Sequence, residues 1–169
     1  MTAPYQKIHV VINPASGRDE PIINTLNDVF HQRGVDWAVS ITQKYGDATA
    51  QAKAAIASGV DLVVGYGGDG TQHEIANAVL SSGGKIPMGI LPAGTGHGFA
   101  SEMGIPKTLR PAVEVLCGSN KIRHIDVAQV GDQYFIQRLY VGIEPEEQTS
   151  REMKDKYGVF AYAINMAQG

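Results

Sequence analysis

The 169-residue sequence predicts an α/β fold: a Rossmann-like parallel sheet with helices on both faces, followed by the start of an antiparallel, β-rich second domain. Short β-branched runs alternate with helical periodicity along residues 7–117, which is typical of a parallel sheet with right-handed crossovers. Glycines gather in bursts directly after the apolar runs. Near Lys121 the alternation stops, and two strand-like runs follow each other without a helix between them.

Apolar runs and helix signals define the predicted elements of the first part. The predicted strands are short runs rich in β-branched residues, at 7–12, 35–42, 61–65 and 86–91. The predicted helices lie between and after these strands, at 21–34, 48–58, 72–81 and 108–117. Pro21 suits the first turn of a helix, Asp47 is the predicted N-cap of the second helix, and Gly59 is predicted to end it.

The second part begins with a hairpin signal. Residues 123–130 and 133–141 predict two strands joined at Gly131-Asp132, and an amphipathic stretch follows at 150–167. We therefore expect a first domain at residues 1–120 and the beginning of a second domain at residues 121–169. One hairpin and one helix are too few to form a stable domain, so the chain is expected to be part of a longer protein.

Composition excludes several classes of function. The formal net charge is −3, so no strong attraction to nucleic acid is expected. No run approaches the roughly 20 apolar residues that span a bilayer, and the amino end lacks the pattern of a secretory signal. The single cysteine, Cys117, excludes an intramolecular disulfide, indicates a reducing compartment and is expected to act as a small apolar residue. The expected location is the cytoplasm, with peripheral membrane contact for any lipid substrate.

Three glycine-rich segments follow predicted strands: 13–17 (NPASG), 65–71 (GYGGDGT) and 92–98 (PAGTGHG). Because the carboxyl ends of parallel strands meet at one edge of a sheet, we expect these segments to converge there. Glycine-rich turns that lead into helices present backbone N–H groups suited to phosphate, and Ser16, Thr71 and Thr95 add hydroxyl donors. Asp69 would repel phosphate by itself, so a bound Mg²⁺ or a proton-transfer role explains it better.

Two familiar phosphate motifs do not fit. No G-x-x-x-x-G-K-[ST] run occurs. Residues 65–70 match G-x-G-x-x-G, but they follow the third strand, and no acid lies between Glu74 and Glu102 to hold a ribose hydroxyl. The five histidines show no zinc-site spacing. His97, between two glycines, is the one histidine that we single out for a functional test.

Taken together, the motifs resemble those of the diacylglycerol kinase catalytic-domain family, which includes bacterial lipid kinases and sphingosine kinases. The matching runs are NPASG (13–17), GGDGT-x-x-E-x-x-N (67–77), LPAGTGHGFA (91–100), Ile125-Asp126-Val127 with Tyr134-Phe135, and KYGVFAY (156–162). The resemblance covers nearly the whole chain. GGDGT alone is shared with NAD kinases and phosphofructokinases, and its combination with the flanking motifs is more specific.

The resemblance implies a kinase that uses ATP and Mg²⁺ in a cleft between two domains and phosphorylates a lipid alcohol such as diacylglycerol. It implies a nucleotide site at Asn13, Pro14, Ser16, Gly17, Thr42, Gly67, Gly68, Asp69, Gly70, Thr71, Glu74, Gly94 and Thr95. Asp69 would be the catalytic acid, either linked to nucleotide-bound magnesium or accepting a proton. For Glu74 a structural cap role is an equal alternative.

The chain departs from the family pattern in two respects. His97-Gly98 stands where the family usually shows a polar pair, which puts a substrate contact in doubt, and the family's sequence continues well past Gly169. Two alternatives stay open: an NAD kinase, and a nucleotide-binding module without turnover. Aromatic residues within 157–162 would be exposed if the second domain were incomplete, which leaves a homo-oligomer open.

Overall fold

The computed structural model describes residues 3–17, 19–93, 98–119 and 121–137. Residues 1–137 cluster as one compact unit, and the description below concerns that unit. The predicted site residues Gly94 and Thr95, the test candidate His97 and the predicted helix at 150–167 lie outside the described residues. The same holds for the last part of the strand predicted at 133–141.

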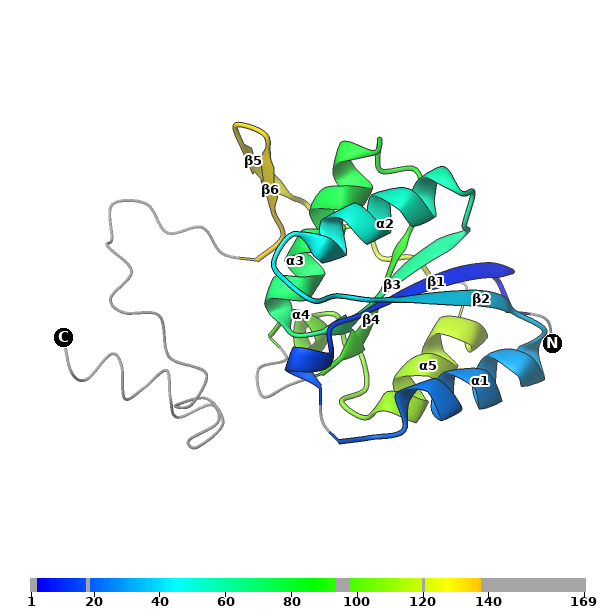
Figure 1. The fold of residues 1–169 in the computed structure, drawn as a ribbon. Coiled ribbons are helices and arrows are strands. Elements are labelled where there is room, and N and C mark those ends of the chain that lie inside the picture. The colour runs from blue at the N-terminus through cyan, green and yellow to red at the C-terminus, as the bar shows by residue number, and fades with distance from the viewer. Residues whose placement is uncertain (1–2, 18, 94–97, 120, 138–169) are drawn as a thin grey trace, which may run out of the picture. The chain divides into compact units, whose positions relative to one another are not determined.

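Four parallel strands form the central sheet (Figure 1). They are β1 (Lys7–Ile12), β2 (Asp36–Ile41), β3 (Leu62–Gly67) and β4 (Met88–Pro92), and their order is β2-β1-β3-β4. All six residues of β3 are buried because the strand is central and both of its faces are covered. Ile8 of β1 pairs with Trp37 on one side and with Leu62 on the other.

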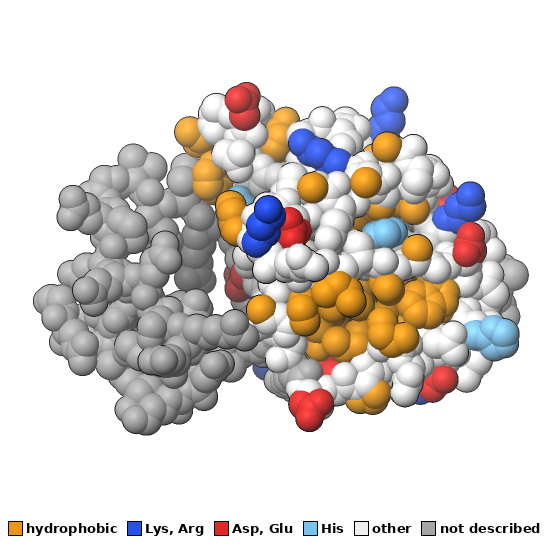
Figure 2. Space-filling view, in the orientation of Figure 1, with side chains coloured by type: hydrophobic (Ala, Val, Ile, Leu, Met, Phe, Trp, Pro, Cys, Tyr) orange, Lys and Arg blue, Asp and Glu red, His pale blue; other side chains and the backbone are white. Residues whose placement is uncertain are grey.

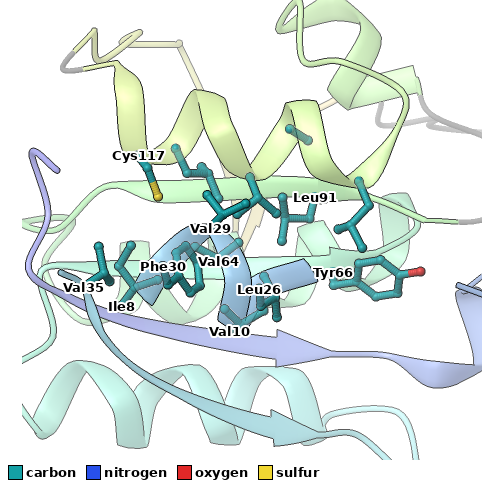
Figure 3. Packing of buried hydrophobic residues seen from close by; sticks show 14 of the residues in the cluster. Ile8, Val10, Leu26, Val29, Phe30, Val35, Val64, Tyr66, Leu91 and Cys117 are labelled. Carbon is teal, nitrogen blue, oxygen red and sulfur yellow. The ribbon is translucent and has the colours of Figure 1, made fainter. Parts of the chain in front are cut away.

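Helices cover both faces of this sheet, as predicted (Figure 1). The elements α1 (Ile22–Arg33) and α5 (Leu109–Gly118) pack on one face, and α2 (Asp47–Ala57) and α3 (Asp69–Ser81) pack on the other. On the first face, Figure 3 shows Leu26, Val29 and Phe30 of α1 packed with side chains of β1 and β3. The second face is filled mainly by small or β-branched residues: Val11, Val63, Ala48, Ala52, Ala55, Ile75, Ala78 and Val79.

Three smaller elements complete the described unit. A 3₁₀ turn, η1 (Pro14–Ser16), follows β1, and the short helix α4 (Gly98–Glu102) was not predicted. The hairpin consists of β5 (Ala128–Val130) and β6 (Gln133–Phe135), joined through Gly131, whose φ of +58° favours glycine. The sequence predicted longer strands. Residues 121–127 are exposed and find no neighbouring strand among the described residues, so their alternating pattern forms no ladder.

Two local predictions were wrong at helix starts. Helix α3 begins at Asp69, three residues before the predicted start, so most of the expected glycine loop is strand or helix. Asp47 is the first residue of α2 and not its N-cap, which is Gly46. The Asp47 carboxylate accepts hydrogen bonds from the N–H groups of Gln43 and Lys44 at 2.9 and 3.1 Å, and these bonds lower its pKa.

One surface of the unit is distinctly apolar. Figure 2 shows hydrophobic side chains gathered on the face that carries β2 and α1. Within these two elements, Ile23, Val39 and Ile41 are exposed. Within the part of the chain that the structure describes, no helix has the length and apolar character that crossing a bilayer requires.

Candidate functional site

The strand order places a topological switch point at the carboxyl ends of β1 and β3. These strands are neighbours in the sheet, but β1 leads to α1 on one face while β3 leads to α3 on the opposite face. Open α/β sheets bind ligands at such a switch point, outside the carboxyl ends of the strands. The predicted segments 13–17 and 65–71 meet here, as expected from the sequence.

Asn13 connects the end of β1 to β3 and α3. Its backbone N–H donates to the carbonyl of Tyr66 at 2.9 Å, and its Nδ2 donates to Thr71 Oγ1 at 2.9 Å. Its Oδ1 accepts from the N–H of Ala15 at 3.0 Å, which caps η1 with Pro14 in the first position. Because the Thr71 hydroxyl oxygen accepts this hydrogen bond from Asn13, the Thr71 hydroxyl proton is directed to another acceptor.

The glycines around the start of α3 differ in what the fold requires of them. A Cβ at Gly67 would lie 2.5 Å from Thr71 Oγ1, so packing alone requires glycine there. At Gly68 a Cβ would meet no atom of the described residues nearer than Ala93 O at 3.8 Å, and its φ of −79° and ψ of −177° suit any residue. Gly70 has nothing within 4 Å, although glycine is less favourable than alanine in a helix by up to about 1 kcal/mol. Among the described residues, packing and backbone conformation therefore give no reason for glycine at Gly68 or Gly70.

Gly17 has a packing role of its own. A Cβ at this position would lie 3.1 Å from the hydroxyl oxygen of Tyr66, whose ring is fully buried beneath the segment. The Tyr66 hydroxyl donates to Glu20 Oε1 at 2.7 Å. Segment 13–20 is therefore fastened at Asn13 and at Glu20. Between these points Ser16 is half-buried, with its Oγ 3.9 Å from the Cβ position at Gly68.

Asp69 stands in the first turn of α3 and is half-buried. Its Oδ1 accepts from the N–H of Phe99 at 3.3 Å, and its Oδ2 lies 3.3 Å from the position that a Cβ at Gly98 would take. Among the described residues no side chain caps α3, so its first N–H groups and the positive end of its dipole lie uncapped at the switch point. A carboxylate beside uncapped N–H donors suits an anion that carries a cation with it.

Two other predicted residues, Thr42 and Glu74, make contacts with β1 and α2. Thr42 is buried at the carboxyl end of β2, where its N–H donates to the carbonyl of Ile12 at 2.9 Å. Glu74 turns toward α2: its Oε2 accepts from the N–H groups of Gly46 and Thr49 at 3.0 and 3.4 Å. This is the cap role that the sequence left open, and a nucleotide contact by Glu74 stays a prediction.

Two buried polar residues of α3, Gln72 and Asn77, were given no role from the sequence, although Asn77 ends the matching run at 67–77. The Nε2 of Gln72 donates to the carbonyls of Gly65 and Gly67 at 2.9 and 3.4 Å. The amide of Asn77 donates to the carbonyl of Tyr134 and accepts from its N–H, both at 2.8 Å. The signal in the sequence was the break in the apolar stripe of α3 at these two positions, because buried amides need specific partners.

The acidic chemistry of the site comes from a single carboxylate in the described residues. No group of three His, Cys, Asp or Glu that could hold a metal ion occurs among them. The arrangement thus offers backbone N–H donors at the start of α3, the hydroxyls of Thr71 and Ser16, and the Asp69 carboxylate. Such a set can bind a phosphate group and neutralise its charge with a divalent cation.

Comparison with known proteins gives relatives with kinase names. A diacylglycerol kinase from Staphylococcus saprophyticus is 29% identical over 164 residues, covering 94% of this chain and 53% of the relative. A Klebsiella pneumoniae protein named "Probable lipid kinase YegS-like" is 31% identical, covering 92% and 53%. The crystal structure of a diacylglycerol kinase from Bacillus anthracis matches with a TM-score of 0.69 and 27% identity, covering 80% of this chain and 51% of that one.

The chain spans about half the length of the curated relatives that it matches. The model of the diacylglycerol kinase catalytic domain matches residues 7–130, which include β1, the segment 13–17, the start of α3 and β5. The chain therefore belongs to the diacylglycerol kinase catalytic domain family.

Proposed function

We propose that this chain is the nucleotide-binding part of an ATP-dependent lipid kinase, which transfers the γ-phosphate to a hydroxyl of a lipid alcohol such as diacylglycerol. Membership in the family supports a kinase, and the names of the relatives support a lipid acceptor. ATP, Mg²⁺ and the acceptor are parts of the proposal, as are the cytoplasmic location and the transient membrane contact.

One observation supports the nucleotide site most directly. Gly68 and Gly70 flank Asp69 at the uncapped start of α3, and neither backbone conformation nor packing among the described residues accounts for them. A Cβ at either position would occupy space beside the N–H groups that a phosphate needs. Glycine at position 70 makes α3 less stable than alanine would, and a ligand-binding role would explain this glycine.

Each residue then has a proposed task. The N–H groups at the start of α3 and the Thr71 hydroxyl would hold phosphate oxygens, and Asn13 would orient that hydroxyl. Asp69 would hold nucleotide-bound Mg²⁺ or take the proton of the acceptor hydroxyl. When bound, Mg²⁺ would supply charge neutralisation on the transferring group. Positioning and charge neutralisation account for most of phosphoryl-transfer catalysis. The N–H groups, the Thr71 hydroxyl and the Asp69 carboxylate are the kinds of group that these two tasks need.

Calorimetric titration of the chain with Mg-ATP, Mg-ADP and NAD tests the proposal. We expect the adenine nucleotides to bind and Gly68→Val to abolish binding while circular dichroism stays unchanged. Gly118→Val is the matched control, since a Cβ at Gly118 would meet no described atom within 4 Å and the backbone there is not left-handed. Figure 3 places the neighbouring Cys117 beside Ile8 and Val35, at the end of the core away from Tyr66.

The alternatives predict different titrations. An NAD kinase would bind NAD, and a longer protein that includes this chain would phosphorylate NAD and no lipid. A nucleotide-binding module would bind Mg-ATP without transfer to any acceptor, even in that longer protein. Failure of both this chain and the longer protein to bind adenine nucleotides would overturn the proposed function.

A further inference from the structure

The end of the hairpin brings a side chain to Asp69 that the sequence did not indicate. Gln137 follows β6 by two residues and is exposed. Its Nε2 lies 3.0 Å from the point where a Cβ at Gly98 would stand, and Asp69 Oδ2 lies 3.3 Å from the same point. The carboxamide and the carboxylate therefore flank one small, solvent-accessible position beside the start of α3.

A specific contact on α3 holds the hairpin in this place. Asn77 pairs with the backbone of Tyr134 through both polar atoms of its amide, as a neighbouring strand would, with two bonds of 2.8 Å. The rings of His73 and Phe135 lie 5.7 Å apart between centroids on the same side of α3.

The segment between β6 and Gln137 is anchored as well. Ile136 packs against the small apolar cluster that Ile90, Phe99 and Ala100 form around α4. Phe99 is also the residue whose N–H binds Asp69. The hairpin thus contacts both α3 and α4, the two helices whose first residues line the position between Asp69 and Gln137.

We propose that Gln137 is a further residue of the nucleotide site and that Asn77 is the positioning residue that places it beside Asp69. The proposal rests on the proposed function. The Gln137 carboxamide donates a hydrogen bond to a phosphate oxygen of the nucleotide. A neutral donor is suited to this place because a second carboxylate beside Asp69 would repel the same phosphate.

The first test replaces the donor by an acceptor of the same shape. Gln137→Glu is expected to weaken Mg-ATP binding in calorimetry by about tenfold or more, because it removes a hydrogen bond to a charged group and adds repulsion. Gln133→Glu is the matched control: it adds the same charge to the same hairpin at an exposed residue that begins β6. It is expected to change the affinity by less than about twofold.

The second test asks whether Asn77 acts through Gln137. Asn77→Asp keeps an acceptor for the Tyr134 N–H but places a carboxylate oxygen against the Tyr134 carbonyl. Hydrogen exchange at the Tyr134 amide is expected to accelerate, and Mg-ATP affinity is expected to fall as in Gln137→Glu. The double variant Asn77→Asp/Gln137→Glu is expected to bind no more weakly than Gln137→Glu alone.

The outcomes separate this inference from the proposed function. If Gly68→Val abolishes binding while Gln137→Glu and Gln133→Glu bind alike, the inference is wrong and the proposed site stands. If Tyr134 exchange accelerates without a change in affinity, Asn77 has only a structural role. If Gly68→Val also leaves binding unchanged, both the site and the inference are overturned. Gln137→Glu decides the question by itself if Asn77→Asp does not fold.

Discussion

Adding one methyl group to each of two adjacent glycines should have opposite effects on stability. At Gly67 a Cβ would lie 2.5, 2.6 and 2.8 Å from the Oγ1, Cβ and Cγ2 of Thr71. These atoms branch directly from the backbone of a buried helical residue, so Thr71 cannot rotate a flexible end away. At Gly68 the nearest atoms would be Ala93 O and Ser16 Oγ at 3.8 and 3.9 Å, which are ordinary contacts.

The magnitudes follow from these distances. Overpacking a core costs about 1–3 kcal/mol, and a displaced Thr71 would also weaken its hydrogen bond with Asn13, worth about 1 kcal/mol. Gly67→Ala should therefore lower the free energy of unfolding by about 2–4 kcal/mol. Gly68→Ala should raise it by about 0.4–1 kcal/mol, because alanine restricts the unfolded chain and fits the extended backbone at this position.

Urea unfolding followed by circular dichroism measures both free energies, and calorimetry measures Mg-ATP binding. We expect Gly68→Ala to weaken Mg-ATP binding although it stabilises the fold, since its methyl group would stand where a phosphate approaches. Equal destabilisation by the two variants would refute the packing argument. Unchanged affinity in Gly68→Ala would refute the assignment of this glycine to a ligand.

Three further predictions concern Glu74, Cys117 and His9. Glu74→Ala should lower the free energy of unfolding in urea by about 1–2 kcal/mol, because α2 loses its cap, and should leave Mg-ATP affinity little changed. A large loss of affinity at unchanged stability would instead support a nucleotide contact. Burial raises the pKa of Cys117 to about 11, so a disulfide reagent at about pH 8 should react only as fast as the chain opens, and fast reaction of the folded chain would contradict this. Burial lowers the pKa of His9, so the unfolded state binds its proton first and stability should fall as pH drops below about 6.5; His9→Gln should reduce that slope in urea midpoints measured against pH.

The sequence predicted the layers of the fold because burial on both faces leaves a strong pattern. β3 is apolar on both faces, and the periodicity of α1 ends at Gly34, whose φ of +66° requires glycine. The β3–α3 junction was misplaced because glycine is normally a turn signal. Here Gly67 lies in a strand and packs closely against Thr71, while Gly70 lies in a helix with open space beside it, and composition alone does not distinguish these positions from a turn.

The sequence predicted the location of the site better than it predicted which side chains form it. Convergence of segments 13–17 and 65–71 follows from parallel strands alone. The direction in which Glu74 points depends on where α2 packs, and the approach of Gln137 depends on how the hairpin meets α3. Both are tertiary contacts between distant parts of the chain, and no local pattern encodes them.

Helix α3 connects the site to three other elements through one polar side chain for each. Gln72 binds the last carbonyls of β3, Glu74 binds the start of α2, and Asn77 binds β6. Apolar residues would stabilise the buried positions of Gln72 and Asn77 at less cost, and Gln72 Oε1 has no hydrogen-bond partner among the described residues. Amides and carboxylates, unlike apolar contacts, fix both distance and direction. These polar residues of α3 thus hold its first turn, which carries Asp69 and Thr71, in a fixed position relative to the end of β3, the start of α2 and the hairpin.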